Sequence, residues 1–126
     1  MEKLVNCNII IKIELIELIS GGNQEFEVLF STKDKEKYKI TFNSVWDMRY
    51  SIENGYIDRF SKFSRNAKQE SSVLMVENSE YIKYFEKQVS GTRPINNLKN
   101  YILSDTVDTV IEILTVSEPK FVKVLS

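Results

Sequence analysis

The chain has 126 residues, of which 42% are hydrophobic and 28% charged, a composition typical of one globular domain. Its 17 basic and 18 acidic residues leave a formal net charge of -1, which argues against general nucleic-acid binding because phosphate backbones attract a basic surface. The chain has no histidine and a single cysteine, which excludes histidine-based catalytic triads, imidazole metal sites and internal disulfides. We therefore expect a single domain over residues 1–126 that is not an enzyme and carries no cofactor or metal.

The first apolar segment, residues 8–20, is dense in isoleucine. One face of an extended chain would carry Ile9, Ile11, Ile13 and Leu15, and the other Ile10, Lys12, Glu14 and Ile16. This period of two and the many β-branched side chains favour a long strand. Residues 14–20 repeat glutamate and two aliphatic residues with a period of three, so a helix over that stretch remains the alternative. The glycine pair at 21–22 is expected to end the element.

The middle of the chain is patterned as antiparallel hairpins. Apolar residues alternate with polar ones over residues 25–30, 38–42 and 46–52, which is typical of strands with one face in water. The Asn-Gly pair at 54–55 is a strong hairpin signal, because both residues tolerate positive φ. It predicts a return strand directly after the pair.

One helix is expected between residues 79 and 89. Asn78 or Ser79 caps its start, and Gly91 and Pro94 follow its end. Apolar residues recur in it at three- and four-residue spacing, which gives one buried stripe and places Phe85 in the core. The stripe consists of Tyr81, Ile82, Phe85 and Val89.

The remaining segments predict a loop and more strands. Polar residues 61–72 are expected to form an exposed loop, and strands are expected at 73–76, 98–103, 107–115 and 121–124. With the hairpins, this makes about seven or eight strands. The expected fold class is α+β: a twisted antiparallel sheet, or a partly closed barrel, with one main helix at about 79–89.

Charged and aromatic residues of the central hairpin form the first candidate site. Asp47 and Arg49 lie on one face of a strand, and Arg59 is expected on its partner. One interpretation is a ladder of acid–base pairs, each worth about 0.2–1 kcal/mol to the sheet. The other is a binding surface, since Trp, Tyr and Arg dominate binding hot spots. The aromatic residues that flank the charged strip are Trp46, Tyr50 and Tyr56.

Three carboxylates near the last predicted hairpin, those of Asp105, Asp108 and Glu112, form the second candidate site. On a strand, Asp108 and Glu112 point to the same face. Carboxylates that share a pocket act as general acid and base or hold a divalent cation. The alternative interpretation is that these acids are solvated positions at a sheet edge, where charge discourages aggregation.

Several short stretches carry a resemblance: VWDMRY at 45–50, ENSEYIKYF at 77–85, NYI at 100–102 with VDTV at 107–110, and EP at 118–119. In their order they resemble small bacterial immunity-type proteins, the partners of contact-delivered or polymorphic toxins. The resemblance implies a cytoplasmic inhibitor that binds a toxin domain and occludes its active site. The balanced charge departs from the acidic immunity proteins that neutralise nuclease toxins.

The expected function is therefore that of an immunity-type binding protein whose partner is a cognate toxin domain. The alternatives are a small carboxylate-dependent enzyme and a self-associating module that forms a homodimer through an edge strand at 107–114 or 121–124. We expect no membrane partner, because no apolar run reaches the roughly 20 residues of a membrane helix. The residues expected to contact a protein partner are Trp46, Asp47, Arg49, Tyr56, Arg59, Asp105, Asp108 and Glu112.

Overall fold

The larger of two sheets has six strands. A computed structural model of the chain describes residues 2–52, 64–65, 71–89 and 97–124. The strand order of this sheet is β5-β9-β8-β7-β1-β6, and its neighbours are antiparallel except for the parallel pair β1 and β6. The bounds are β1 Lys3–Asn6, β5 Val45–Ile52, β6 Ser64–Arg65, β7 Val73–Glu77, β8 Lys99–Ser104 and β9 Thr109–Thr115.

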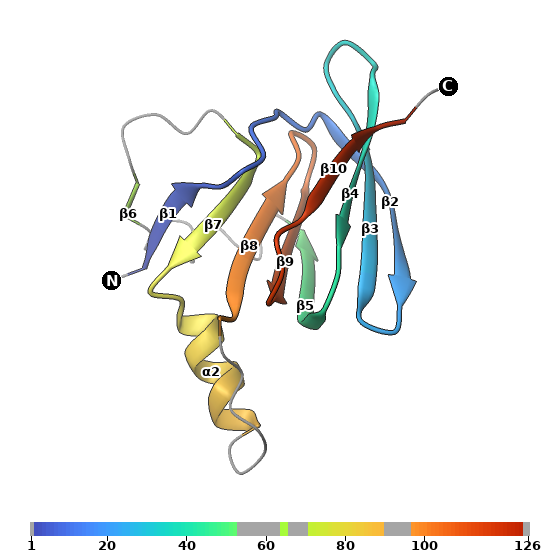
Figure 1. Cartoon of the computed structure of the whole chain (residues 1–126). Helices are drawn as coiled ribbons and strands as arrows, with labels where there is room; N and C mark the ends of the chain where they lie inside the picture. The colour runs from blue at the N-terminus through green and yellow to red at the C-terminus, as the bar shows by residue number, and fades with distance from the viewer. Residues whose placement is uncertain (1, 53–63, 66–70, 90–96, 125–126) are drawn as a thin grey trace.

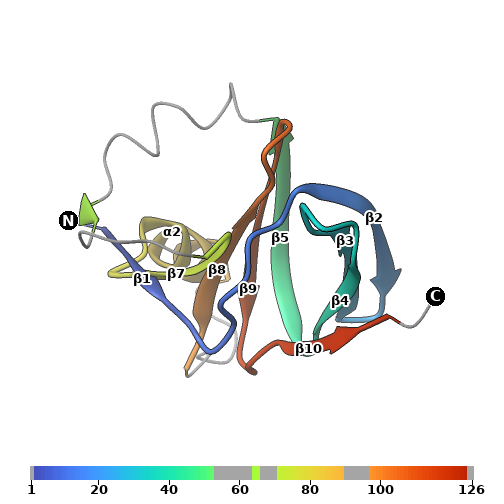
Figure 2. The ribbon, with the colours of Figure 1, turned by 90° about the horizontal axis from the view of Figure 1, so that it is seen from above.

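The smaller sheet is an antiparallel meander with one added strand. Its order is β10-β4-β3-β2, with bounds β2 Leu15–Gly22, β3 Glu25–Ser31, β4 Lys37–Phe42 and β10 Lys120–Lys123. Seen from above, this sheet and helix α2 (Glu80–Gln88) lie on opposite sides of the six-stranded sheet (Figure 2). The expected α+β class is confirmed: the described residues form antiparallel strands, divided between two sheets, and one helix.

The alternating patterns of the middle hairpins are explained by the core between the sheets. Val28 and Phe30 of β3 and Ile40 and Phe42 of β4 are fully buried. They pack against residues of the six-stranded sheet, among them Tyr101, Leu103, Ile111 and Ile113. The other face of the six-stranded sheet holds a second cluster made of Leu4, Leu74, Val76, Ile102 and Val110. The six-stranded sheet is therefore covered on both faces over its centre.

The predicted long strand over residues 8–20 is correct only from residue 15 onward. Residues 7–14 form no strand and cross from the six-stranded to the four-stranded sheet (Figure 1). Ile9 and Ile13 are buried in the core, and the backbone N–H of Ile13 donates to the Ser72 hydroxyl at 2.9 Å. Ile10, in contrast, is 55% exposed, so this segment has one buried side without being part of a sheet. The predicted exposed loop is also wrong at Ser71, which is 4% exposed and accepts from the N–H of Ile11.

Strand β2 continues through the glycines that were expected to end it. The helical alternative for residues 14–20 is wrong, because β2 pairs with β3 along its length. The hairpin turn falls on Asn23 and Gln24, which adopt φ of 54° and 68°. Gly21 has a φ of 141°, and a Cβ there would lie 2.1 Å from the Glu25 carbonyl oxygen, so glycine is required.

Helix α2 and its N-cap are confirmed, but the predicted burial of the whole apolar stripe is not. Ser79 is the N-cap, and its hydroxyl accepts from the N–H of Ile82 at 3.0 Å. Tyr81 is 2% exposed, whereas Phe85 is only half-buried. In Figure 1 the helix projects past the ends of β7 and β8, so its later turns have less of the sheet to pack against.

Of the two strands predicted as edges for self-association, one lies inside its sheet and the other lies at an edge. β9 has hydrogen-bonded neighbours on both sides, β5 and β8, so residues 107–114 are not an edge. β10 pairs only with β4 and is an edge strand, as predicted. The return strand expected after the Asn-Gly pair at 54–55 lies outside the described residues. No helix within the described ranges is long and apolar enough to cross a membrane.

Candidate functional site

Three of the predicted contact residues lie together on the face of the six-stranded sheet that meets α2. Asp47 and Arg49 come from β5, and Glu112 comes from the neighbouring β9. Arg49 and Glu112 are directly opposite in the register, and Asp47 is opposite Leu114. Opposite residues of antiparallel strands point to the same face, so the register brings the three charged side chains together.

Two tyrosines of α2 complete this group. The Tyr81 hydroxyl donates to Asp47 Oδ2 at 2.7 Å, and the Arg49 guanidinium carbon lies 3.7 Å from the centroid of the Tyr81 ring. The same guanidinium carbon is 5.9 Å from the Tyr84 ring centroid, within the range of a cation–π contact. We call this group the Arg49 cluster; it consists of Asp47, Arg49, Tyr81, Tyr84 and Glu112.

Burial divides the Arg49 cluster into an inner and an outer part. Glu112 is fully buried and Tyr81 nearly so, whereas Tyr84 is 56% exposed. Burial of Tyr81 raises the pKa of its phenol well above the usual value, and the hydrogen bond to Asp47 raises it further. The burial of Glu112 corrects the interpretation that it is a solvated edge acid, because β9 is an interior strand.

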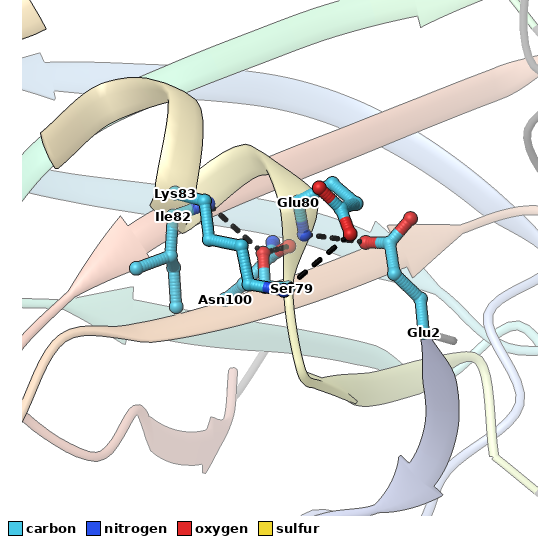
Figure 3. A network of polar contacts seen from close by, with 6 residues as sticks. All are labelled: Glu2, Ser79, Glu80, Ile82, Lys83 and Asn100. Atoms are coloured by element: carbon cyan, nitrogen blue, oxygen red, sulfur yellow. Dashed lines mark hydrogen bonds and ion pairs between the residues drawn. The ribbon is translucent and has the colours of Figure 1, made fainter. Parts of the chain in front are cut away.

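The start of α2 is held by a polar network that positions Tyr81. The Ser79 hydroxyl donates to Asn100 Oδ1 at 2.8 Å, and Asn100 is fully buried on β8 (Figure 3). At the next residue, the backbone N–H of Glu80 donates to Glu2 Oε2 at 3.0 Å. Helix α2 is therefore anchored to β8 and to the start of the chain, and its first turn lies against the sheet.

Trp46 is the residue before Asp47 on β5 and lies at an irregularity of the strand. Val45 pairs with Thr115 and Asp47 with Leu114, so Trp46 is the extra residue of a β-bulge. Its side chain is 43% exposed. The two other predicted contact residues of this hairpin, Tyr56 and Arg59, lie outside the described residues.

Asp105 and Asp108 do not join Glu112. Asp105 Oδ1 accepts from the N–H groups of Val107, Asp108 and Thr109 at 3.0, 2.9 and 2.9 Å, and Oδ2 accepts from Ile16 at 3.0 Å. This carboxylate therefore caps the β8–β9 turn. The turn and α2 lie at opposite ends of the sheet (Figure 1). Across the described ranges, no group of three or more acidic or sulfur ligands is placed to hold a metal ion.

The single cysteine, Cys7, is half-buried and lies next to two backbone carbonyl groups. Cys7 Sγ lies 3.6 Å from the Val73 carbonyl oxygen and 3.7 Å from that of Ile9. Burial raises the pKa of the Cys7 thiol, which disfavours the nucleophilic thiolate.

The Arg49 cluster lines neither of two hollows formed by described residues. One hollow, of about 200 Å³, lies at the end of the β2–β3 hairpin; the other, of about 170 Å³, lies between β2 and Tyr50. Both are smaller than the roughly 300–1,000 Å³ usual for ligand pockets. Comparison with known proteins adds no assignment: no family model matches the chain, and no curated protein or solved structure matches it significantly.

Sequence reasoning missed the helical half of the Arg49 cluster. Tyr81 was assigned to the apolar stripe of the helix, and Tyr84 was not considered. The available signal was their spacing of three residues, which places both rings on neighbouring positions of one helix surface. Which strand the rings meet depends on how the helix packs.

Proposed function

We propose that this protein is an immunity-type binding protein that neutralises a cognate bacterial toxin domain by covering it. Its sequence resemblance to such proteins suggests the class, and the Arg49 cluster suggests the contact surface. The observation that most supports this surface is the position of Arg49. Its guanidinium carbon lies 3.7 Å from the Tyr81 ring centroid, next to the exposed residue Tyr84. The protein would act in the cytoplasm, where it would meet a toxin domain that has entered the cell.

The geometry favours binding because the exposed groups are of the right type and are already ordered. Trp, Tyr and Arg are the residues enriched in binding hot spots. Trp46 and Tyr84 are 43% and 56% exposed. Stacking on Tyr81 restrains Arg49 before any partner arrives, which lowers the entropy lost on association. By contrast, the carboxylate-enzyme alternative needs Asp105 to converge with Glu112, and Asp105 instead binds the backbone of the β8–β9 turn.

The test is direct binding and protection. The purified protein is titrated with a candidate toxin domain encoded by a neighbouring gene, and the same pair is co-expressed in a toxin-sensitive strain. We expect a stable complex at micromolar concentration and restored growth. Tyr84→Ala should weaken binding by about tenfold or more, as for a hot-spot aromatic. The matched control is Lys120→Ala on the exposed edge strand β10, which should leave affinity nearly unchanged.

No complex at micromolar concentration, together with no protection, would overturn the proposal. An affinity of Tyr84→Ala equal to that of the wild type and of Lys120→Ala would show that the protein binds through a different surface.

A further inference from the structure

The guanidinium of Arg49 has hydrogen-bonding capacity that its neighbours do not use. Its recorded contacts are the rings of Tyr81 and Tyr84, and it forms no hydrogen bond or ion pair with any residue that the structure describes. Asp47, the acid two residues before it, instead accepts the Tyr81 hydroxyl at 2.7 Å. An arginine side chain carries five N–H donors.

These donors reach solvent. Among the described residues, no fully buried side-chain nitrogen or oxygen lacks a hydrogen-bond partner. The guanidinium of the half-buried Arg49 lies over the Tyr81 ring, and because its nitrogens form no hydrogen bond within the described residues, they are not sealed from water. An ordered, planar guanidinium with an open edge matches the geometry of a carboxylate, which accepts two parallel N–H bonds.

We propose that Arg49 receives a single carboxylate side chain of the protein partner, with Tyr81 holding the guanidinium plane. This inference rests on the proposed function and deepens it, because it names the chemistry that the toxin domain presents. The partner should carry an exposed aspartate or glutamate at the centre of its contact surface.

The surroundings of Arg49 favour one carboxylate over a nucleic-acid backbone. Asp47 and Glu112 share its face of the sheet, and the whole chain has a net charge of -1. A nucleic-acid backbone needs several cations along its length, whereas one carboxylate needs only one cation at the point of contact. A carboxylate pairs with the planar guanidinium through two parallel N–H bonds, so replacement of Arg49 by lysine should not preserve the interaction.

The experiment compares Arg49→Lys and Arg49→Ala with the matched control Lys83→Ala. Lys83 is an exposed α2 residue whose ion pair with Glu80 spans 3.5 Å. Affinity for the toxin domain is measured by calorimetry, and folding is checked by thermal unfolding of each variant. We expect both Arg49 variants to bind about tenfold or more weakly, because lysine cannot stack or form the paired bonds. Lys83→Ala should change affinity by less than about twofold.

The partner carboxylate is then identified by replacing each exposed aspartate and glutamate of the toxin domain with its amide. One replacement should be non-additive with Arg49→Ala in a double-mutant cycle. If the wild-type protein binds but Arg49→Lys binds equally well, or no acid couples to Arg49, this inference is wrong while the proposed function stands. Binding of the wild type to single-stranded DNA is also measured at increasing salt concentration. An affinity that falls steeply with salt in the wild type but not in Arg49→Ala would show that Arg49 binds phosphate instead. If the wild type does not bind the toxin domain, the proposed function itself fails.

Discussion

Removal of one hydroxyl group, by Tyr81→Phe, tests the geometry of the Arg49 cluster most directly. The Tyr81 hydroxyl donates to Asp47 Oδ2 at 2.7 Å, and the residue is 2% exposed. Phenylalanine keeps the ring on which the Arg49 guanidinium stacks, so the substitution removes only the hydrogen bond.

The magnitude follows from the charge and exposure of the two partners. A hydrogen bond to a charged group contributes about 1.5–3 kcal/mol to stability. Asp47 is half-buried, so water partly replaces the lost donor and the effect belongs at the lower end of that range. We expect the free energy of unfolding to fall by about 1.5 kcal/mol in Tyr81→Phe.

The assay is urea unfolding followed by fluorescence, with the denaturant slope compared between variants. The control is Tyr84→Phe, whose ring is 56% exposed and which should change stability by less than about 0.5 kcal/mol. A double-mutant cycle with Asp47→Ala should give a coupling of about 1 kcal/mol. A loss below about 0.5 kcal/mol for Tyr81→Phe, with no coupling, would refute the hydrogen bond and with it the position of α2.

Three further predictions concern the fold. Burial raises the pKa of Tyr101 to about 12, and the pKa of Tyr81 is raised too, so above pH 10 the unfolded state releases protons that the folded state keeps. Stability should therefore fall by about 1.4 kcal/mol per pH unit for each tyrosine between pH 10 and pH 12, and a titration of Tyr81→Phe should show a shallower fall. Asp105→Ala leaves four backbone N–H groups without their acceptor and should lower the unfolding free energy by about 1–3 kcal/mol; an unchanged urea midpoint would contradict the cap. Phe30→Ala should cost about 3–5 kcal/mol because Phe30 is fully buried, whereas half-buried Phe85→Ala should cost clearly less, and equal losses by calorimetry would contradict the placement of the helix.

Local patterns in the sequence were sufficient to predict the elements whose environment is set by their own residues. The alternation of apolar and polar residues in β3 and β4 predicts one buried and one more exposed face, and burial alternates in the same way along both strands. The helix start follows from Ser79, because a serine side chain satisfies a backbone N–H that the helix leaves free.

Tertiary structure decided everything that depends on neighbours distant in the chain. Residues 7–14 have the pattern of a strand, yet they cross between the sheets, and Ile9 and Ile13 are buried by the core without strand pairing. Glu112 has the sequence context of an edge acid, but its strand is flanked by β5 and β8, which removes it from water. The contact between Arg49 and Tyr81 joins a strand to a helix 32 residues later, and only the packing of α2 on the sheet brings them together. The periodicity of a sequence indicates which side of a segment is buried. Which residues cover that side depends on how the sheets and the helix pack together.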